Sequence, residues 1–259
     1  MTSGLTAAGI QRLRRAGLEV VLLDIEGTTT PMAFVHDVLF PYARERLAAW
    51  FRERSPSDPT VREIVGALEQ EARDTGEAPG SEWTIDEVVA RLADYIDRDR
   101  KSPALKIVQG LIWESGYASG ELRSPVYDDV PPALERWTNA GIGVGIYSSG
   151  SVLAQKLLFA HSNAGDLTPW LRWHFDTATG AKVDAASYRR ITDALHVKPS
   201  AVLFVSDVTR ELEAARHASL QTALCVRPPA PAPASSFPVI QSFDEIDRLT
   251  LAIPSAGSC

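Results

Sequence analysis

Short apolar runs bounded by turn residues recur along the chain and are typical of strands buried on both faces. The clearest is the run of four branched apolar residues at 20–23, which enters an acidic turn rich in glycine and threonine. Similar runs at 141–147 and 201–206 and a weaker one at 221–228 predict three more strands. The last is expected to be followed by a proline-rich loop and by a helix at 243–253.

Between the first two of these strands the pattern changes to helical periods. Apolar residues at helical spacing fill 33–51, where Pro41 is expected to kink or restart the helix. The capping-box spacings at 60–63 and 84–87 predict the starts of two further helices. Ser102-Pro103 predicts another start, because serine caps helices well and proline suits the first helical position.

Strands that alternate with helices outside this block predict an α/β fold with a doubly wound parallel sheet. We therefore expect a Rossmann-like core formed by residues 1–30 and 129–259, with a helical cap of residues 31–128 inserted into it. Open sheets of this kind bind ligands at the carboxyl ends of their strands. Functional side chains are expected at that edge.

Polar residues follow the predicted strands at this edge. Two acidic strand ends suit Mg²⁺, which prefers oxygen ligands, and a lysine with two serines at a helix amino terminus suits a phosphate. Taken one at a time, these residues could equally form a solvated turn or a plain helix cap. Their convergence favours a site, and its members are Asp24, Glu26, Ser148, Ser149, Lys182 and Asp207.

Composition narrows the class of protein. The net charge of -7 disfavours nucleic acid and anionic membranes as partners, since both are bound chiefly through an excess of lysine and arginine. The two cysteines, Cys225 and Cys259, disfavour a disulfide framework or a structural zinc site, and a cytoplasmic location is expected. The sequence has neither an apolar signal-peptide core nor a stretch that approaches a membrane span. Serine catalysis is a poor fit because G-x-S-x-G is absent and the five histidines are scattered.

The ordered set of Asp-x-Glu at 24–26, Ser148, Lys182 and Ser206-Asp207 with an acidic residue at 211 resembles the haloacid dehalogenase superfamily of phosphohydrolases. Longer segments are similar to the acireductone synthase family, the enolase-phosphatases of methionine salvage. These segments include DIEGTTTPMAFVHDVLFPYAR, YSSGS, HFDTATGAK with SYRRI, LFVSDVTRELEAA and, in the expected cap, DRKSPALKIVQGLIW. The similarity covers most of residues 18–226.

Three departures from the family pattern stand out. His36 occupies a position where lysine is expected, Ser219 one where glycine is expected, and the loop after Arg227 lacks a Gly-Asn pair. The change at His36 could alter a contact with substrate or within the cap. The other two are interpreted as changes in packing or loop structure.

The resemblance implies that 2,3-diketo-5-methylthiopentyl 1-phosphate is enolised and then dephosphorylated to the acireductone. It assigns Asp24 as the nucleophile that forms an aspartyl-phosphate, and Glu26 as the group that protonates the leaving oxygen and then activates water. Lys182 with Ser148 and Ser149 would hold the phosphate. One Mg²⁺ per subunit would be held by Asp24, by Asp207 and, through its backbone carbonyl, at Glu26. A monomer is the expectation that the family gives.

Alternatives remain at this stage. A phosphatase for another small phosphate ester would keep the core residues and differ in the cap, while a binding protein without turnover would keep only the fold. A dehalogenase that attacks carbon would not need the metal carboxylate at Asp207. The base for enolisation is either Glu26 or a residue of the cap.

Overall fold

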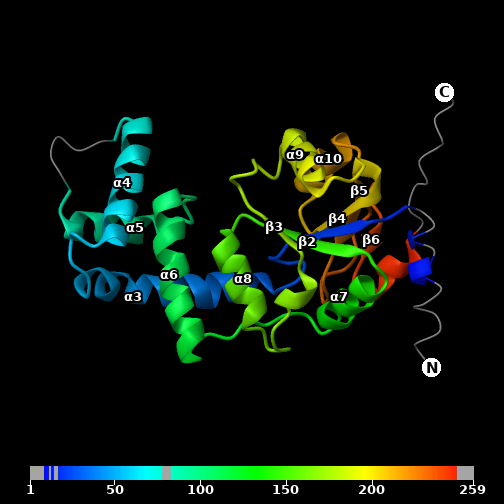
Figure 1. Cartoon of the computed structure of the whole chain (residues 1–259), viewed down its shortest axis with the longest axis horizontal. Helices are drawn as coiled ribbons and strands as arrows, with labels where there is room; N and C mark the ends of the chain where they lie inside the picture. Colours follow the sequence, from blue (N-terminus) through cyan, green and yellow to red (C-terminus); the bar gives the residue numbers. More distant parts are fainter. Residues whose placement is uncertain (1–8, 12, 15–16, 78–82, 250–259) are drawn as a thin grey trace. The chain divides into compact units, whose positions relative to one another are not determined.

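The computed structural model describes residues 9–11, 13–14, 17–77 and 83–249. The chain divides into two compact units, which are shown in Figure 1. The first, here called the core unit, comprises Met1–Met32 and Ser124–Cys259. The second, the helical unit, comprises Ala33–Arg123.

A six-stranded parallel sheet forms the centre of the core unit, with the strand order β3-β2-β1-β4-β5-β6. This order confirms the predicted doubly wound α/β class. The strands are β1 (Val20–Leu23), β2 (Gly143–Tyr147), β3 (Trp173–Phe175), β4 (Val202–Ser206), β5 (Gln221–Cys225) and β6 (Val239–Ile240). From β1 the chain adds β2 and β3 on one side of the sheet, and it then returns to add β4, β5 and β6 on the other side. The loops after β1 and β4 therefore flank the point where such sheets bind ligands.

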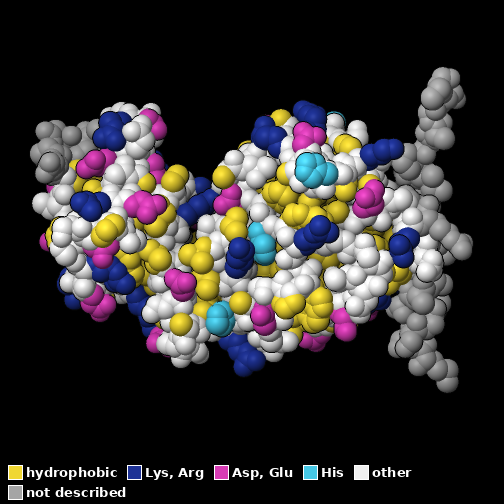
Figure 2. Space-filling model, in the orientation of Figure 1, with side chains coloured by type: hydrophobic (Ala, Val, Ile, Leu, Met, Phe, Trp, Pro, Cys, Tyr) yellow, Lys and Arg dark blue, Asp and Glu magenta, His cyan; other side chains and the backbone are white. Residues whose placement is uncertain are grey.

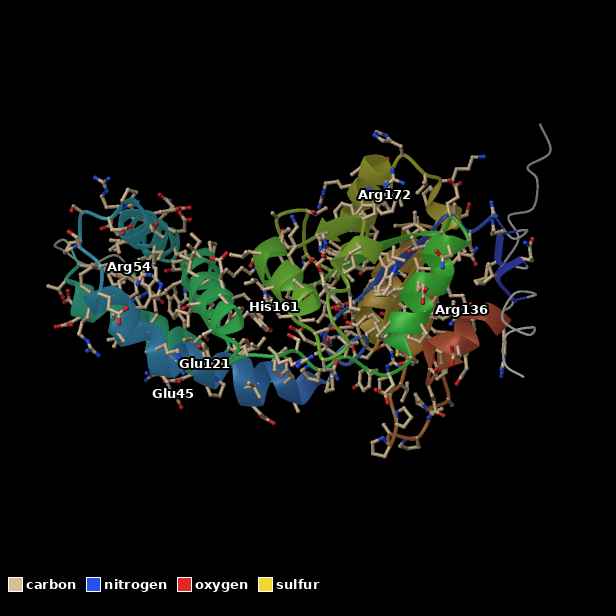
Figure 3. All side chains as sticks on the ribbon, turned by 60° about the horizontal axis from the view of Figure 1, so that its bottom comes forward. Glu45, Arg54, Glu121, Arg136, His161 and Arg172 are labelled. Carbon is tan, nitrogen blue, oxygen red and sulfur yellow. The ribbon has the colours of Figure 1, made fainter. Side chains whose placement is uncertain are left out.

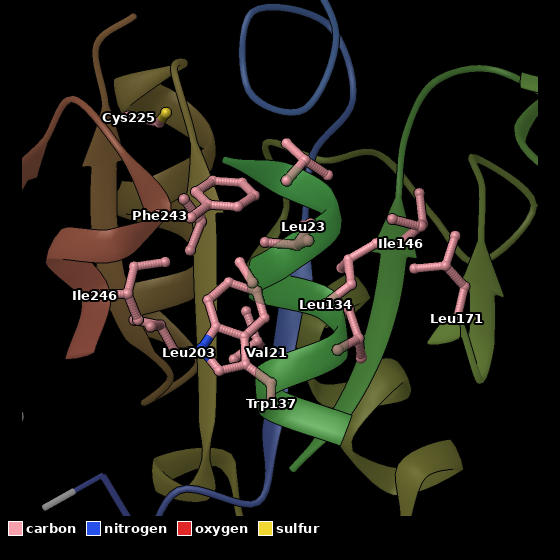
Figure 4. Close-up of a cluster of buried hydrophobic side chains, with 14 of the residues drawn as sticks. Val21, Leu23, Leu134, Trp137, Ile146, Leu171, Leu203, Cys225, Phe243 and Ile246 are labelled. Atoms are coloured by element: carbon pink, nitrogen blue, oxygen red, sulfur yellow. The ribbon is translucent and has the colours of Figure 1, made fainter. Parts of the chain in front are cut away.

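Side chains of β1 alternate between two apolar clusters, one on each face of the sheet. Val21 and Leu23 belong to the cluster that Figure 4 shows, in which Trp137 and Phe243 pack against the strands. Val20 and Leu22 belong to the opposite cluster. Burial on both faces explains why the first strand has no polar alternation.

Helices cover both faces of this sheet. Side chains of α7 (Val130–Asn139) and α8 (Val152–Ala160) enter the first cluster, and those of α9 (Ala185–Leu195) and α10 (Thr209–His217) enter the second. Shorter 3₁₀ turns occur at η2 (Thr168–Trp170) and η3 (Pro199–Ala201). This arrangement leaves the carboxyl ends of the strands for the loops that carry the predicted site.

Three expectations for the core unit need correction or refinement. The helix expected at 243–253 is a 3₁₀ helix, η4 (Phe243–Arg248), and residues from 250 onward lie outside those described. The short strands β3 and β6 were not predicted; they have three and two residues at the two sides of the sheet, too few to show a pattern. Ser219 has a φ of 68°, a left-handed conformation that favours the glycine expected there.

The helical unit contains four main helices: α3 (Phe40–Arg52), α4 (Pro59–Asp74), α5 (Ile85–Asp97) and α6 (Pro103–Ser119). A short α2 (Met32–Phe34) and the π-helical turn η1 (Val35–Leu39) precede α3. In that turn the Phe40 amide donates to the Val35 carbonyl, directly before Pro41. The expected restart at Pro41 is thus a π-helical turn followed without a break by α3.

Helix starts in this unit follow local capping signals. Thr84 and Glu87 form the predicted capping box at α5, and Ser102 caps α6 by accepting a hydrogen bond from the Leu105 amide. The prediction of a capping box beginning at Thr60 is wrong. Asp58 caps α4 instead and accepts from the Thr60 amide at 2.8 Å, which places the threonine inside the first turn.

Candidate active site

The loop after β1 places the first two predicted carboxylates. Asp24 is buried, and the amides of the three following threonines, Thr28 to Thr30, all donate to the Ile25 carbonyl at 2.8–3.1 Å. Gly27 has a φ of 71°, and a Cβ there would lie 2.2 Å from Oδ2 of Asp207. Glycine therefore allows both the tight turn and the close approach of Asp207 to the loop.

A buried ionic network surrounds Asp24. Nζ of Lys182 lies 2.6 Å from Oδ1 of Asp24 and 2.6 Å from Oε2 of Glu211. Oγ of Ser206 lies 2.9 Å from Oδ2 of Asp24 and 3.1 Å from Oε2 of Glu211, so its single proton is shared between two carboxylates. The sequence placed Glu211 one turn after Asp207 but did not predict its contact with Lys182.

The electrostatics of this network follow from burial and close charges. Burial lowers the pKa of Lys182, but the charges of Asp24 and Glu211 outweigh that effect, and the pKa is raised. The lysine is therefore positively charged at neutral pH. Burial and the charge of Asp24 raise the pKa of Glu211 to about 7, although Lys182 and Ser206 lower it.

Two buried tyrosines fix the turn that carries Lys182. The Tyr188 hydroxyl donates to the Lys182 carbonyl at 2.7 Å, and the Tyr147 hydroxyl donates to the Gly180 carbonyl at 2.9 Å. Their rings also contact each other edge to face at 5.5 Å. The ammonium is consequently presented from a turn that is held on both sides.

Asp207 has the features of a metal ligand. Its Oδ1 is buried without a hydrogen-bond partner among the described residues, which is costly for a carboxylate unless a cation completes it. Burial and the charge of Asp24 raise the pKa of Asp207 to about 6. Asp24 and Asp207 thus suit a divalent ion, which would relieve both effects.

The donor set has two carboxylates rather than three. In the described part of the chain, three or more His, Cys, Asp or Glu side chains do not gather into a metal cluster. Mg²⁺ usually keeps several waters alongside one or two carboxylates, and the contribution of Glu26 through its backbone carbonyl stays a prediction. Glu26 lies in the same loop and pairs with Thr30 in a parallel bridge.

The predicted serine corner follows β2. Ser148 is buried, and its Oγ accepts from the Gly150 amide at 3.1 Å, while Ser149 is half-buried. The helix cap of α8 is Ser151, which accepts from the Ala154 amide. Phosphate binding by Ser148 and Ser149 stays a prediction.

Gln155 is a further residue of this corner that the sequence did not reveal. It is buried, and its Nε2 donates to the carbonyls of Gly150 and Phe175 at 3.1 and 2.8 Å. Its Oε1 lies 3.2 Å from Nδ1 of His174, whose pKa is lowered to about 4 by burial and by Lys156. A neutral His174 donating to Gln155 would fix the amide and hold the serine turn against β3.

Charged side chains of both signs are interspersed on the face of each unit that Figure 2 shows. Among the described residues, none of the helices is both long enough and apolar enough to cross a membrane.

Comparison with known proteins identifies clear relatives. The family model described as "Hydrolase: haloacid dehalogenase-like hydrolase" matches residues 18–219. A protein named Enolase-phosphatase E1 from Synechococcus elongatus is 47% identical over 233 residues, which cover 88% of this chain and 98% of that protein. Its namesake from Drosophila mojavensis is 47% identical over 239 residues, covering 89% and 96%. The crystal structure of the UTR4 protein from Saccharomyces cerevisiae has a TM-score of 0.71 and 33% identity, covering 87% of this chain and 98% of that one.

Proposed function

Since the chain belongs to the enolase-phosphatase E1 family of the haloacid dehalogenase-like hydrolases, we propose that its buried Asp24 and Lys182 perform the phosphatase step of that family. The chain is an enolase-phosphatase of methionine salvage. It converts 2,3-diketo-5-methylthiopentyl 1-phosphate into the acireductone 1,2-dihydroxy-3-keto-5-methylthiopentene and phosphate. The observation that supports the proposed roles best is the 2.6 Å contact between Nζ of Lys182 and Oδ1 of Asp24.

Asp24 is the proposed nucleophile. Oδ1 accepts from the Ile25 amide at 2.8 Å and contacts Lys182, while Oδ2 contacts Ser206, so the carboxylate is held in one orientation. Its attack on phosphorus forms an aspartyl-phosphate and breaks the bond to the enolate oxygen of the substrate. The charge of Lys182 stabilises the phosphoryl oxygens during this transfer.

Glu26 is the proposed acid and base. It would give a proton to the leaving enolate oxygen and then take one from the water that hydrolyses the aspartyl-phosphate. Its place two residues after Asp24, in a loop fixed by the threonine amides, suits both tasks. Ser148 and Ser149 would bind the remaining phosphate oxygens.

One Mg²⁺ per subunit is part of the proposal, held by the side chains of Asp24 and Asp207 and by the backbone carbonyl of Glu26. When bound, the ion neutralises charge on the nucleophile and on the phosphoryl oxygens. The unpartnered Oδ1 of Asp207 supports this assignment.

We assign residues 1–30 and 129–259 as the catalytic core and residues 31–128 as the cap that selects the substrate. The compact units of the structure divide the chain a few residues away, after Met32 and after Arg123. A cytoplasmic monomer, without nucleic acid or membrane as partner, completes the proposal. Size-exclusion chromatography with light scattering tests the oligomeric state.

Enolisation is the less constrained step. We propose that Glu26 takes the proton from the substrate carbon, which the adjacent carbonyls acidify. Glu26→Ala should then slow enolisation, which is measured by ultraviolet absorbance. A wild-type rate would transfer this role to a cap residue.

Asp24→Asn should abolish phosphate release while enolisation continues and the phosphorylated enol accumulates. Full turnover by that variant would refute Asp24 as nucleophile.

The first experiment is turnover of the diketo phosphate with and without Mg²⁺, with phosphate release and enol absorbance recorded together. Both signals should appear with Mg²⁺ and disappear with a chelator. Phosphate release from simple esters but not from this substrate would contradict the proposed specificity. Turnover unaffected by the chelator would contradict the proposed metal site.

A further inference from the structure

Arg227 lies just beyond β5, at the carboxyl edge of the sheet, and is buried. Its Nε and Nη2 donate to one acceptor, the Thr28 carbonyl, at 2.9 and 2.7 Å. Thr28 belongs to the loop that carries Asp24 and Glu26. A residue 199 positions away in the sequence therefore holds the backbone of the loop on which the chemistry depends.

The guanidinium is itself fixed on several sides. Nη1 pairs with Oδ2 of Asp129 at 2.6 Å and approaches the Gln241 carbonyl at 3.4 Å. Its carbon lies 4.3 Å from the ring centroid of Tyr127 and 4.5 Å from that of Phe243. These contacts satisfy the charge and orient the plane of the fork, so the two donors to Thr28 are aimed before any ligand binds.

Neutralising the buried charge does not by itself require the contact with Thr28. The carboxylate of Asp129 supplies the counter-charge, and its Oδ2 also accepts from the Phe243 amide at 2.6 Å. The hydrogen bonds that Nε and Nη2 of Arg227 donate to the Thr28 carbonyl are therefore made in addition to the ion pair. A second contact acts on the adjacent carbonyl, since the Tyr127 amide donates to the Thr29 carbonyl at 3.1 Å.

We propose that Arg227 is a positioning residue for catalysis, which fixes the loop after β1 so that the Glu26 carbonyl, the Glu26 side chain and the Asp24 carboxylate keep their relative places. This inference rests on the proposed function, because it concerns the same loop. It predicts a role in kcat and in Mg²⁺ binding beyond any role in stability. A displacement of the loop by about 1 Å is enough to cost on the order of 10²-fold in rate.

Arg227→Lys is the test variant. A lysine keeps the positive charge opposite Asp129 but lacks the planar fork that places two donors on one carbonyl. We expect kcat to fall by about 10- to 100-fold and the Mg²⁺ concentration for half-maximal activity to rise. The substrate KM should change little, because Arg227 holds the loop rather than the substrate. Hydrogen exchange of a peptide spanning residues 24–30 should become faster in the metal-free protein.

Arg136→Lys is the matched control. Arg136, which is labelled in Figure 3, lies on α7, and its Nε pairs with Oδ2 of the buried Asp247 at 2.9 Å. Its side chain is 16% exposed, compared with 6% for Arg227, and it also pairs with Asp244. The control should lower the melting temperature while leaving kcat, the Mg²⁺ dependence and the exchange of residues 24–30 at wild-type values.

The proposal is overturned if Arg227→Lys loses only stability, with kcat, Mg²⁺ dependence and loop exchange like those of Arg136→Lys. If Arg227→Lys does not fold, Asp129→Asn provides the test, because it keeps the guanidinium but removes its counter-charge. Faster exchange of residues 24–30 and a few-fold lower kcat then support the proposal, and wild-type values refute it. Loop exchange is measured without substrate, so failure of the proposed function in the wild type is seen separately as absent Mg²⁺-dependent turnover.

Discussion

The buried ion pairs of the described residues lie in the core unit, whereas those of the helical unit are at least partly exposed. In the core unit the side chains of Lys182 and Asp24 are 7% and 4% exposed, and Arg227 with Asp129 is similarly buried. In the helical unit the pair of Arg44 and Asp97 is 46% and 56% exposed. Among the described residues, every ion pair with both side chains under one-fifth exposed belongs to the core unit.

The difference in solvent exposure between these ion pairs distinguishes a role in the reaction from a role in stability. Burying an ion pair removes two charges from water, and an apolar replacement of similar volume is often as stable or more stable. Exposed ion pairs contribute little to the free energy of unfolding, and little is lost when one is removed. The buried pairs of Lys182 with Asp24 and of Arg227 with Asp129 are therefore better explained by the reaction they serve than by the stability they add. The pair of Arg136 with Asp247 lies outside the proposed site and is not explained in this way. Substitutions in the two units should separate the two roles.

The largest difference should come from Lys182→Met compared with Arg44→Met. Removing the ammonium leaves Asp24 and Glu211 buried beside each other without a cation, which should cost about 3–5 kcal/mol of unfolding free energy. Phosphate release should fall by on the order of 10²–10³-fold or more, because the charge on the phosphoryl group is no longer stabilised. Arg44→Met should cost less than about 1 kcal/mol.

Urea unfolding and phosphate release measure these effects. In Lys182→Met the loss of stability should be smaller at pH 5 than at pH 8, since Glu211, with its pKa already raised to about 7, can take up a proton in the folded state. Equal losses for the two methionine variants would remove the distinction between the units.

Asp207→Asn should separate stability from function within the core unit. In the metal-free protein the substitution removes a buried charge near Asp24, so the melting temperature should rise by a few degrees, roughly what 1 kcal/mol produces. Addition of Mg²⁺ should stabilise the wild type, by about 2.7 kcal/mol at a hundred times the dissociation constant, but not the variant. Activity should fall by at least about 10²-fold. A thermal shift of the variant equal to that of the wild type would exclude Asp207 as a ligand.

The pH dependence of Mg²⁺ binding should report the same carboxylate. Its pKa is raised to about 6 in the metal-free protein, and a proton on it competes with the ion. Mg²⁺ affinity should therefore weaken as pH falls below 6, by up to about tenfold per unit for one proton. Calorimetric titration from pH 7.5 to 5 measures this.

The raised pKa of Asp207 also predicts that the stability of the metal-free protein changes with pH in the direction opposite to the Mg²⁺ affinity. Because the folded pKa lies above the unfolded value, protonation favours the folded state, and Asp207 destabilises the metal-free protein most above pH 6. The stability gap between Asp207→Asn and the wild type should therefore shrink as pH falls from 7 toward 4. A constant gap would contradict the raised pKa.

The sequence allowed the helical unit to be predicted because its signals are local. The capping box at Thr84 and the serine cap at Ser102 involve residues three positions apart, and both are present. The error at Thr60 arose between two neighbouring candidates, where Asp58 and the proline after it made the stronger cap.

The core unit was predictable only in part. Buried central strands and the carboxyl-edge rule placed Asp24, Lys182 and Asp207 together, whereas the edge strands β3 and β6 depend on neighbours that a local pattern does not reveal. The contact of Arg227 with the first loop joins segments brought together only by the sheet. Side-chain partners of this kind require the tertiary structure.

The smallest predicted effect compares two helix ends, one in each unit. After α6, Gly120 has a φ of 79°, and after α10, Ser219 has a φ of 68°. Glycine adopts this left-handed conformation without the steric cost that serine bears. Ser219→Gly should therefore stabilise the core unit by roughly 0.5–1 kcal/mol, and Gly120→Ser should destabilise the helical unit by a similar amount.

Both substitutions lie at helix termini outside the proposed site, and a Cβ at Gly120 would meet nothing within 4 Å, so conformation rather than a clash should decide the result. Urea unfolding with phosphate release as the control checks both variants, with kcat expected at the wild-type value. If Ser219→Gly lowered stability, the serine side chain would have to contribute more than its backbone costs. The left-handed serine would then stabilise this chain, rather than being a strain that the fold tolerates in place of the expected glycine.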